Sequence, residues 1–183
     1  MSTVAKDYTL AELMICANAA AYADDGEVLV TGIGVLPRLA ASLAMKTVNT
    51  DIMMTDSQAW LLPDGFRQMN ETWMGFSRIF DNVWSGRRHI TGGPTQIDRF
   101  GQANISALGD SYRQPKIQML GVRGFPGNSI CHANSWFVPS HNKRVFVDGE
   151  CDVVCTIGYN PARLPRGYRL ADIDLRLGST DLC

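Results

Sequence analysis

Hydrophobic positions near the start of the chain recur at a helical period. Thr9-Leu-Ala-Glu12 has the form of a capping box, with Thr9 at the N-cap and Glu12 three positions into the helix. The pattern predicts an alanine-rich helix that runs to about residue 23. Its apolar face is expected to carry Leu13, Ala17, Ala20 and Ala21.

A strand, a glycine-containing turn and a second helix follow. Residues 28–31 are a short β-branched run, Gly32-Ile-Gly34 makes the turn, and residues 37–45 are rich in Ala and Leu with a proline at their start. This order predicts a βα unit. The lone G-x-G is a weak sign of a nucleotide site, because close packing of a helix on a strand explains it at least as well.

A second predicted strand, residues 51–55, ends in Asp56-Ser57-Gln58. Open α/β sheets bind ligands at the carboxyl ends of their parallel strands, so Asp56 and Ser57 are candidate site residues. The alternative is a simple capped turn, which Asp and Ser also favour.

Aromatic side chains are concentrated between residues 60 and 84. Trp73, Phe76, Phe80 and Trp84 recur at a helical spacing, which is typical of a core or interface stripe. The same residues would also suit the wall of a large apolar pocket. An interface or a pocket wall is the favoured interpretation.

The remaining pattern predicts an α/β protein with an open, mostly parallel sheet flanked by helices. Residues 90–93 form a predicted strand that enters a glycine turn, and the preceding Arg87 and Arg88 are expected to be solvated or paired with acids. Residues 98–101 predict a turn. Further strand-like runs lie at residues 104–106, 136–139, 145–147, 152–157, 174–177 and 180–183.

The stretch Gly121-Val-Arg-Gly-Phe-Pro-Gly127 follows another strand-like run, residues 117–120. Glycines at this density let backbone N–H groups approach a ligand and hold an anion or a developing oxyanion. Arg123 adds a planar cation suited to a carboxylate, an enolate or a phosphate. A surface turn is the alternative, but Cys131-His-Ala-Asn-Ser-Trp136 follows, and such polar loops often carry function.

Composition limits the class of protein. The 183 residues predict a single domain, residues 1–183, with 45% hydrophobic and 19% charged residues. The net charge of −1 gives no electrostatic footprint for nucleic acid or an anionic membrane. The five cysteines lack a C-x-x-C, and Cys151 and Cys155 lie in a valine-rich run that favours buried thiols over a metal site. With no signal peptide or membrane span visible, we expect a reduced cytoplasmic protein without a metal.

Three segments together resemble the β-type subunit of class I coenzyme A transferases. They are residues 26–62, residues 92–109 with GGPTQIDRFGQANIS as the most specific run, and residues 116–134. The resemblance implies an open α/β sheet whose active site lies between an α and a β subunit, in an α2β2 heterotetramer. The chain is expected to be shortened at its carboxyl end, or to have its last strand covered by the partner, because the family continues further.

One departure from the transferases points to a particular branch. Transferases of this class carry a nucleophilic glutamate where this chain has Asp56 or Ser57. The chain looks more like the branch that lost it, the steroid ring-opening hydrolases, which hydrolyse a carbon–carbon bond in a cyclic β-diketone held as a coenzyme A thioester. In that branch the acid/base carboxylate lies on the α subunit.

The resemblance implies roles for several residues. Arg123 and the backbone of Gly124 and Gly127 would stabilise an oxyanion and then an enolate. Asp56 would bind or orient rather than attack. The remaining expected substrate-binding residues are Asn128, His132, Asn134, Trp73 and Phe76. No cofactor is expected beyond the coenzyme A of the substrate. A transferase with Asp56 as nucleophile and a non-catalytic partner subunit that only binds acyl-CoA remain alternatives.

Overall fold

The centre of the protein is a six-stranded sheet in the order β10-β5-β1-β2-β3-β4. The structure is a computed structural model that describes residues 7–55, 60–62, 72–122, 124–127, 133–164, 166–167 and 169. The strands are β1 (Leu29–Gly32), β2 (Met53–Thr55), β3 (Trp60–Leu61), β4 (Thr72–Trp73), β5 (Arg88–Gly92) and β10 (Ala133–Trp136). The four strands β10, β5, β1 and β2 are parallel, whereas β3 and β4 are antiparallel additions at one edge. The predicted mostly parallel α/β sheet is therefore confirmed.

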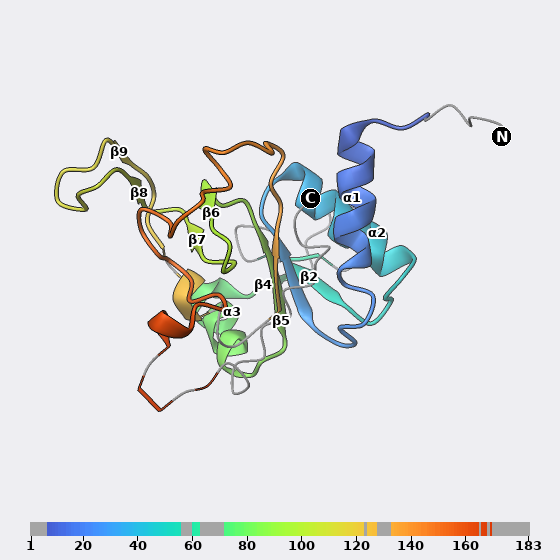
Figure 1. Ribbon diagram of the computed structural model, residues 1–183. Coiled ribbons are helices and arrows are strands. Elements are labelled where there is room, and N and C mark those ends of the chain that lie inside the picture. Colours follow the sequence, from blue (N-terminus) through green and yellow to red (C-terminus); the bar gives the residue numbers. More distant parts are fainter. Residues whose placement is uncertain are drawn as a thin grey trace.

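Helices cover both faces of the sheet (Figure 1). Helices α1 (Leu10–Ala20) and α2 (Val35–Lys46) lie side by side on one face, where Tyr22, Val30, Ala40 and Met54 are part of a buried cluster. Helix α3 (Gly75–Trp84) lies on the other face, where its Ile79 packs with Leu29 of β1. We refer to these as the α1/α2 face and the α3 face.

Close packing and backbone conformation explain the glycines in the turn between β1 and α2. A Cβ at Gly32 would lie 2.8 Å from the backbone nitrogen of Arg38, too close for any side chain. Gly34 has φ 105°, a conformation that favours glycine. The packing explanation of the lone G-x-G therefore holds.

The start of helix α1 follows the prediction, but its buried side does not. The amide of Glu12 donates to the Thr9 hydroxyl, and the Thr9 amide donates to the Glu12 carboxylate, so the capping box is confirmed. The predicted apolar face is wrong: Leu13 is exposed, and the buried residues are Met14, Asn18 and Ala19. The polar Asn18 turns inward because its side chain accepts a hydrogen bond from Thr91 of β5.

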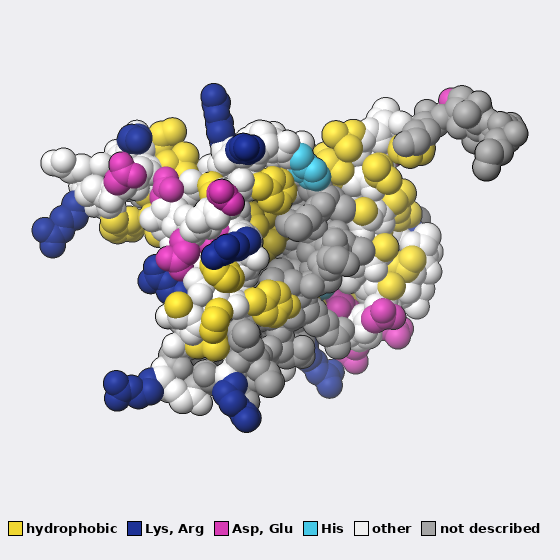
Figure 2. All heavy atoms as spheres, in the orientation of Figure 1, with side chains coloured by type: hydrophobic (Ala, Val, Ile, Leu, Met, Phe, Trp, Pro, Cys, Tyr) yellow, Lys and Arg dark blue, Asp and Glu magenta, His cyan; other side chains and the backbone are white. Residues whose placement is uncertain are grey.

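Beyond β5 the chain forms short hairpins and loops. One hairpin is β6 (Gln96–Ile97) with β7 (Ala103–Asn104), and the other is β8 (Ala107–Leu108) with β9 (Ile117–Gln118). The second hairpin projects from the body in Figure 1, and this projecting part carries basic and acidic side chains in Figure 2. The turn at residues 98–101 is confirmed, and residues 161–163 form a 3₁₀ turn. In place of the predicted strand at residues 145–147, Phe146 forms an isolated bridge with Ile97.

The run GGPTQIDRFGQANIS uses its polar side chains to hold this region together. The buried Asp98 carboxylate accepts the amides of Phe100, Gln102 and Cys151. The Asn104 side chain donates to Gln96 and accepts the amide of Ser106. The run that is most specific in sequence is therefore a structural network.

The predicted buried strand at residues 152–157 is wrong, because these residues form bends. The Asp152 carboxylate accepts the amide of Gly109 at 2.7 Å, and the Thr156 hydroxyl accepts the amide of Ala103 at 2.8 Å. These two hydrogen bonds hold the segment across the hairpins, so it does not pair as a strand. The runs at residues 174–177 and 180–183 lie outside the described residues.

Candidate functional site

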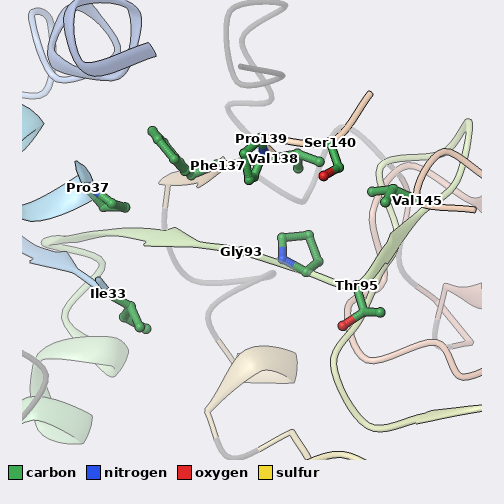
Figure 3. Close-up of a pocket in the computed structure, with 10 residues that line it drawn as sticks. Ile33, Pro37, Gly93, Thr95, Phe137, Val138, Pro139, Ser140 and Val145 are labelled. Atoms are coloured by element: carbon green, nitrogen blue, oxygen red, sulfur yellow. The ribbon is translucent and has the colours of Figure 1, made fainter. Parts of the chain in front are cut away.

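A cavity of about 410 Å³ lies at the point where the strand order of the sheet reverses (Figure 3). The chain passes from β1 to β2 on one side and later enters β5 on the other side of β1. The carboxyl ends of β1 and β5 are therefore a topological switch point, the usual ligand crevice of an open α/β sheet. The lining residues are Ile33, Pro37, Gly93, Pro94, Thr95, Phe137, Val138, Pro139, Ser140 and Val145.

The lining of this cavity suits an apolar group. Ile33 and Pro37 lie on one side in Figure 3, and Thr95 and Val145 lie on the opposite side. No lining side chain carries a charge, and only Thr95 and Ser140 bring hydroxyls. Such a site gains affinity mainly from apolar contact.

The sequence indicated none of these lining residues as site residues. The available signal was position: Gly93 directly follows β5, and Phe137 directly follows β10. Residues at the carboxyl ends of parallel strands are the ones that reach a switch-point crevice.

The stretch Gly121–Gly127, which we call the glycine loop, lies at the same edge of the sheet, toward the α3 face. A Cβ at Gly124 would lie 2.6 Å from the ring of Phe80 on α3. Phe125 is buried and packs on Trp136 at the end of β10, with ring centroids 5.3 Å apart. The loop is therefore held between α3 and the ends of β5 and β10, and Gly127 is part of a helical turn.

The other predicted site residues divide into two groups. Arg123, Asp56, Ser57, Asn128 and His132 lie outside the described residues.

The described aromatics Trp73, Phe76 and Phe80 are exposed. Trp73 belongs to strand β4 and not to helix α3, so the four aromatics do not share one helix. Their exposure excludes a core position for these three, and an interface or a pocket wall stays a prediction.

Asn134, the remaining predicted residue, is buried in a row of side chains that crosses the α3 face. The strand register aligns Thr55 with Thr31, Thr31 with Ile90, and Ile90 with Asn134. The hydroxyls of Thr31 and Thr55 are hydrogen-bonded at 2.9 Å, and both residues are buried. Thr55 is the last residue of β2 and directly precedes Asp56.

The expectation for the paired arginines is right for one and wrong for the other. Arg87 is exposed and lies 3.9 Å from the Glu27 carboxylate. Arg88 is only 6% exposed, and its Nη2 donates to the Thr31 hydroxyl at 3.3 Å. Burial lowers the pKa of the Arg88 guanidinium to about 10, so it still carries its charge at neutral pH.

A buried chain of three polar side chains lies on the α1/α2 face. The Nδ1 of His89 lies 2.5 Å from the Asp25 carboxylate, and its Nε2 lies 2.7 Å from the Ser135 hydroxyl. Tyr22 stacks edge-on against the His89 ring. The sequence Asp25–His89–Ser135 resembles a nucleophilic triad, but Ser135 is only 3% exposed. The arrangement therefore ties the segment after α1 to β5 and β10.

The cysteines behave as buried thiols where they are described. Cys151 and Cys155 are free and buried, as predicted, and burial raises the pKa of Cys151 to about 12. No group of three or more potential metal ligands occurs among the described residues. Within the same part of the chain, no helix is long and apolar enough to cross a membrane.

The parallel sheet, the switch-point cavity and the adjacent glycine loop define a member of the coenzyme A transferase fold. The structure superposes on the crystal structure of Rhodococcus jostii RHA1 IpdAB with a TM-score of 0.78 and 40% sequence identity, covering 85% of this chain and 65% of that one. It also matches glutaconate coenzyme A-transferase from Acidaminococcus fermentans, with a TM-score of 0.64 and 23% identity over 81% of this chain and 62% of that one. This second match supports the fold alone.

Curated relatives narrow the class. The chain is 43% identical over 176 residues to the cholesterol ring-cleaving hydrolase IpdB subunit of Mycobacterium tuberculosis H37Rv, covering 88% of the chain and 70% of the relative. It is 41% identical to the IpdB subunit of Rhodococcus jostii RHA1, covering 87% of the chain and 64% of the relative. It is 31% identical to a 3-oxoadipate CoA-transferase subunit of Pseudomonas knackmussii, covering 77% of the chain and 58% of the relative.

The chain therefore belongs to the family of IpdB subunits of cholesterol ring-cleaving hydrolases, within the coenzyme A transferase superfamily. It spans 64% to 70% of the length of these IpdB relatives. No family model matches the chain.

Proposed function

We propose that this chain is the β subunit of a heteromeric enzyme that opens a steroid-derived ring by hydrolysis. The substrate would be a cyclic β-diketone carried as a coenzyme A thioester, and the bond cleaved would be carbon–carbon. The observation that carries the proposal is the 43% identity to an IpdB subunit across 88% of the chain. The resemblance also puts Asp56 or Ser57 where transferases of this class carry their nucleophilic glutamate.

The proposed chemistry is a retro-Claisen cleavage. Water adds to a ring carbonyl, the carbonyl oxygen becomes an oxyanion, and the carbon–carbon bond breaks to leave a carboxylic acid and an enolate that is then protonated. Arg123 and the amides of Gly124 and Gly127 would stabilise the oxyanion and the enolate, because hydrogen-bond donors fixed in advance favour developing charge. The packing of Gly124 against Phe80 supports this role, since it fixes the loop beside the sheet edge.

The remaining residues would orient the substrate and the water. Asn134, Asn128 and His132 would hydrogen-bond the ring oxygens, whereas Asp56 and Ser57 would hold the water or the thioester at the end of β2. The burial of Asn134 on the α3 face, in the strand whose end faces the glycine loop, supports its role. The apolar switch-point cavity would receive part of the hydrocarbon ring system.

We also propose that the site is completed by an α-type subunit in an α2β2 assembly. The acid/base carboxylate would come from that subunit, so this chain alone would not turn over. The exposed aromatics Trp73 and Phe76 would lie at the subunit interface or line the shared pocket. No cofactor would be needed beyond the coenzyme A of the substrate, and the free buried thiols Cys151 and Cys155 fit a reducing, cytoplasmic setting.

A second candidate function is coenzyme A transfer to a carboxylate, with Asp56 as the nucleophile. The 31% identity to a 3-oxoadipate CoA-transferase subunit supports it. Asp is one methylene shorter than Glu, and a displacement of about 1 Å can cost roughly two orders of magnitude in rate. The hydrolytic function is therefore favoured.

An experiment that traps a covalent enzyme adduct distinguishes the two functions. The chain is co-expressed with its α-type subunit, and the assembled complex is treated with acyl-CoA followed by borohydride or hydroxylamine. Hydrolysis predicts that no covalent adduct forms on this chain. An acyl or coenzyme A adduct on Asp56 would establish the transferase mechanism instead.

A further inference from the structure

The side chain of Arg88 runs along the α3 face toward the carboxyl end of β1. Arg88 is the first residue of β5 and is paired in register with Leu29. Its Nη2, however, donates to Thr31, two residues further along β1. The guanidinium therefore lies one residue short of the end of β1, close to the edge where ligands bind in this fold.

This buried charge has no compensating carboxylate among the described residues. The bond to Thr31 is its only hydrogen bond to them, and Nε and Nη1 are buried without a partner. The charged residues that the covering helix α3 contributes, Arg78 and Asp81, are exposed, and the nearby Glu27 lies against Arg87. An unpaired buried charge costs free energy, so it is a poor choice for packing alone and is typical of functional sites.

The hydrogen bonds of Arg88 lead toward the candidate site. Thr31, which accepts from Arg88, is bonded through its hydroxyl to Thr55, the last residue of β2. On the same face, Gly92 lies against Phe125 of the glycine loop: a Cβ at Gly92 would lie 3.2 Å from that ring. The guanidinium of Arg88 thus lies at the level of Thr31, one residue before the sheet edge on which the loop packs.

We propose that Arg88 is a positioning residue whose buried charge stabilises the enolate of a 1,3-dicarbonyl acyl-CoA bound at this edge. The inference rests on the proposed function, because hydrolytic ring opening releases a ketone enolate, for which the enolate of a bound 1,3-dicarbonyl acyl-CoA is a stable analogue. A cation that water does not screen acts strongly through the protein, so it favours the anionic form of a nearby ligand. Arg88 donates to the Thr31 hydroxyl, which is bonded to that of Thr55, and so also fixes the ends of β1 and β2.

The test uses the assembled complex with acetoacetyl-CoA as the probe. The ultraviolet absorbance of its enolate is followed as a function of pH, which gives the apparent pKa of the bound ligand without any need for turnover. Wild type is expected to lower that pKa relative to the free ligand. Arg88→Met is expected to raise it by at least about one unit relative to wild type, a tenfold loss of enolate at a given pH. Arg88→Lys, which keeps the charge, is expected to retain most of the effect.

Arg87→Met is the matched control, because it removes an exposed neighbouring charge, and it should leave the ligand pKa unchanged. The inference is overturned if wild type does not lower the ligand pKa, or if Arg88→Met matches wild type. If Arg88→Met does not assemble, Arg88→Lys decides: loss of the effect despite the retained charge overturns the inference. If Arg88→Met alone loses the effect, but the wild-type complex opens no steroid ring, the inference about Arg88 stands and the proposed function is rejected.

Discussion

The Nδ1 of His89 lies 2.5 Å from the carboxylate of Asp25, and both side chains are almost completely buried. Because a carboxylate only accepts, Nδ1 donates to it, and Nε2 lies within hydrogen-bond distance of the Ser135 hydroxyl. The pair therefore joins the segment after α1 to the centre of the sheet.

Removing the Asp25 carboxylate should destabilise the protein without touching the site. Asp25→Ala leaves a buried imidazole N–H without its acceptor, and we expect it to lower the free energy of unfolding by about 2 kcal/mol or more. Chemical denaturation measures this change. The neighbouring Asp24 is exposed, so Asp24→Ala serves as control and should stay within about 0.5 kcal/mol of wild type. Equal stability of the two variants would show that the pair contributes nothing.

Gly124 should be needed for turnover because of its contact with Phe80. Gly124→Ala places a methyl group 2.6 Å from the Phe80 ring, so either the loop or the ring must move. We expect kcat to fall by about 10- to 100-fold while assembly with the α-type subunit is retained. The double variant with Phe80→Ala should recover part of the loss by making room. Full activity in Gly124→Ala would contradict a fixed loop.

Arg123 is expected to contribute charge stabilisation to the reaction. Arg123→Ala should lower kcat by about a hundredfold or more, with the complex still assembled, because a donor to the developing oxyanion is lost. Steady-state kinetics of the complex measure it, and Arg113→Ala, an exposed arginine of the projecting hairpin, is the control. Unchanged turnover in Arg123→Ala would remove this residue from the site.

The thiol of Cys151 should resist alkylation in the folded protein. Its pKa of about 12 leaves little thiolate at a mildly alkaline pH, whereas Cys16 is exposed. Peptide mapping after brief alkylation should find Cys16 modified and Cys151 intact, and both modified after denaturation. The same pKa has a consequence for stability: the unfolded thiol ionises near pH 9.0 and the folded one does not, so this contribution to stability is lost between about pH 9 and pH 12. Rapid labelling of native Cys151 would contradict its burial.

Local patterns in the sequence predicted the elements that local interactions determine. The capping box of Thr9 and Glu12, the βα unit around Gly32 and the turn at residues 98–101 depend on neighbours in the chain, and the structure confirms them. The resemblance of three segments to one family predicted the sheet, which the superpositions confirm.

Burial that depends on distant segments was not predictable in the same way. Arg88 begins a strand, where a charged residue usually faces solvent, and only the packing of the α3 face shows it to be buried. The valine-rich run at residues 152–157 has the composition of a strand, but its polar anchors to Gly109 and Ala103 hold it in bends. The switch-point cavity is built from three segments that are far apart in sequence, so no single pattern predicts it.

The most direct test of the proposed hydrolysis follows the oxygen of the water. The assembled complex is incubated with a steroid-derived cyclic β-diketone coenzyme A thioester in ¹⁸O-labelled water, and the product is analysed by mass spectrometry. Hydrolytic ring opening predicts that the coenzyme A thioester is retained and that one ¹⁸O enters the new carboxylate, and neither subunit alone should give this product. A product that has lost coenzyme A to an added carboxylate, with the ring intact, would contradict the account.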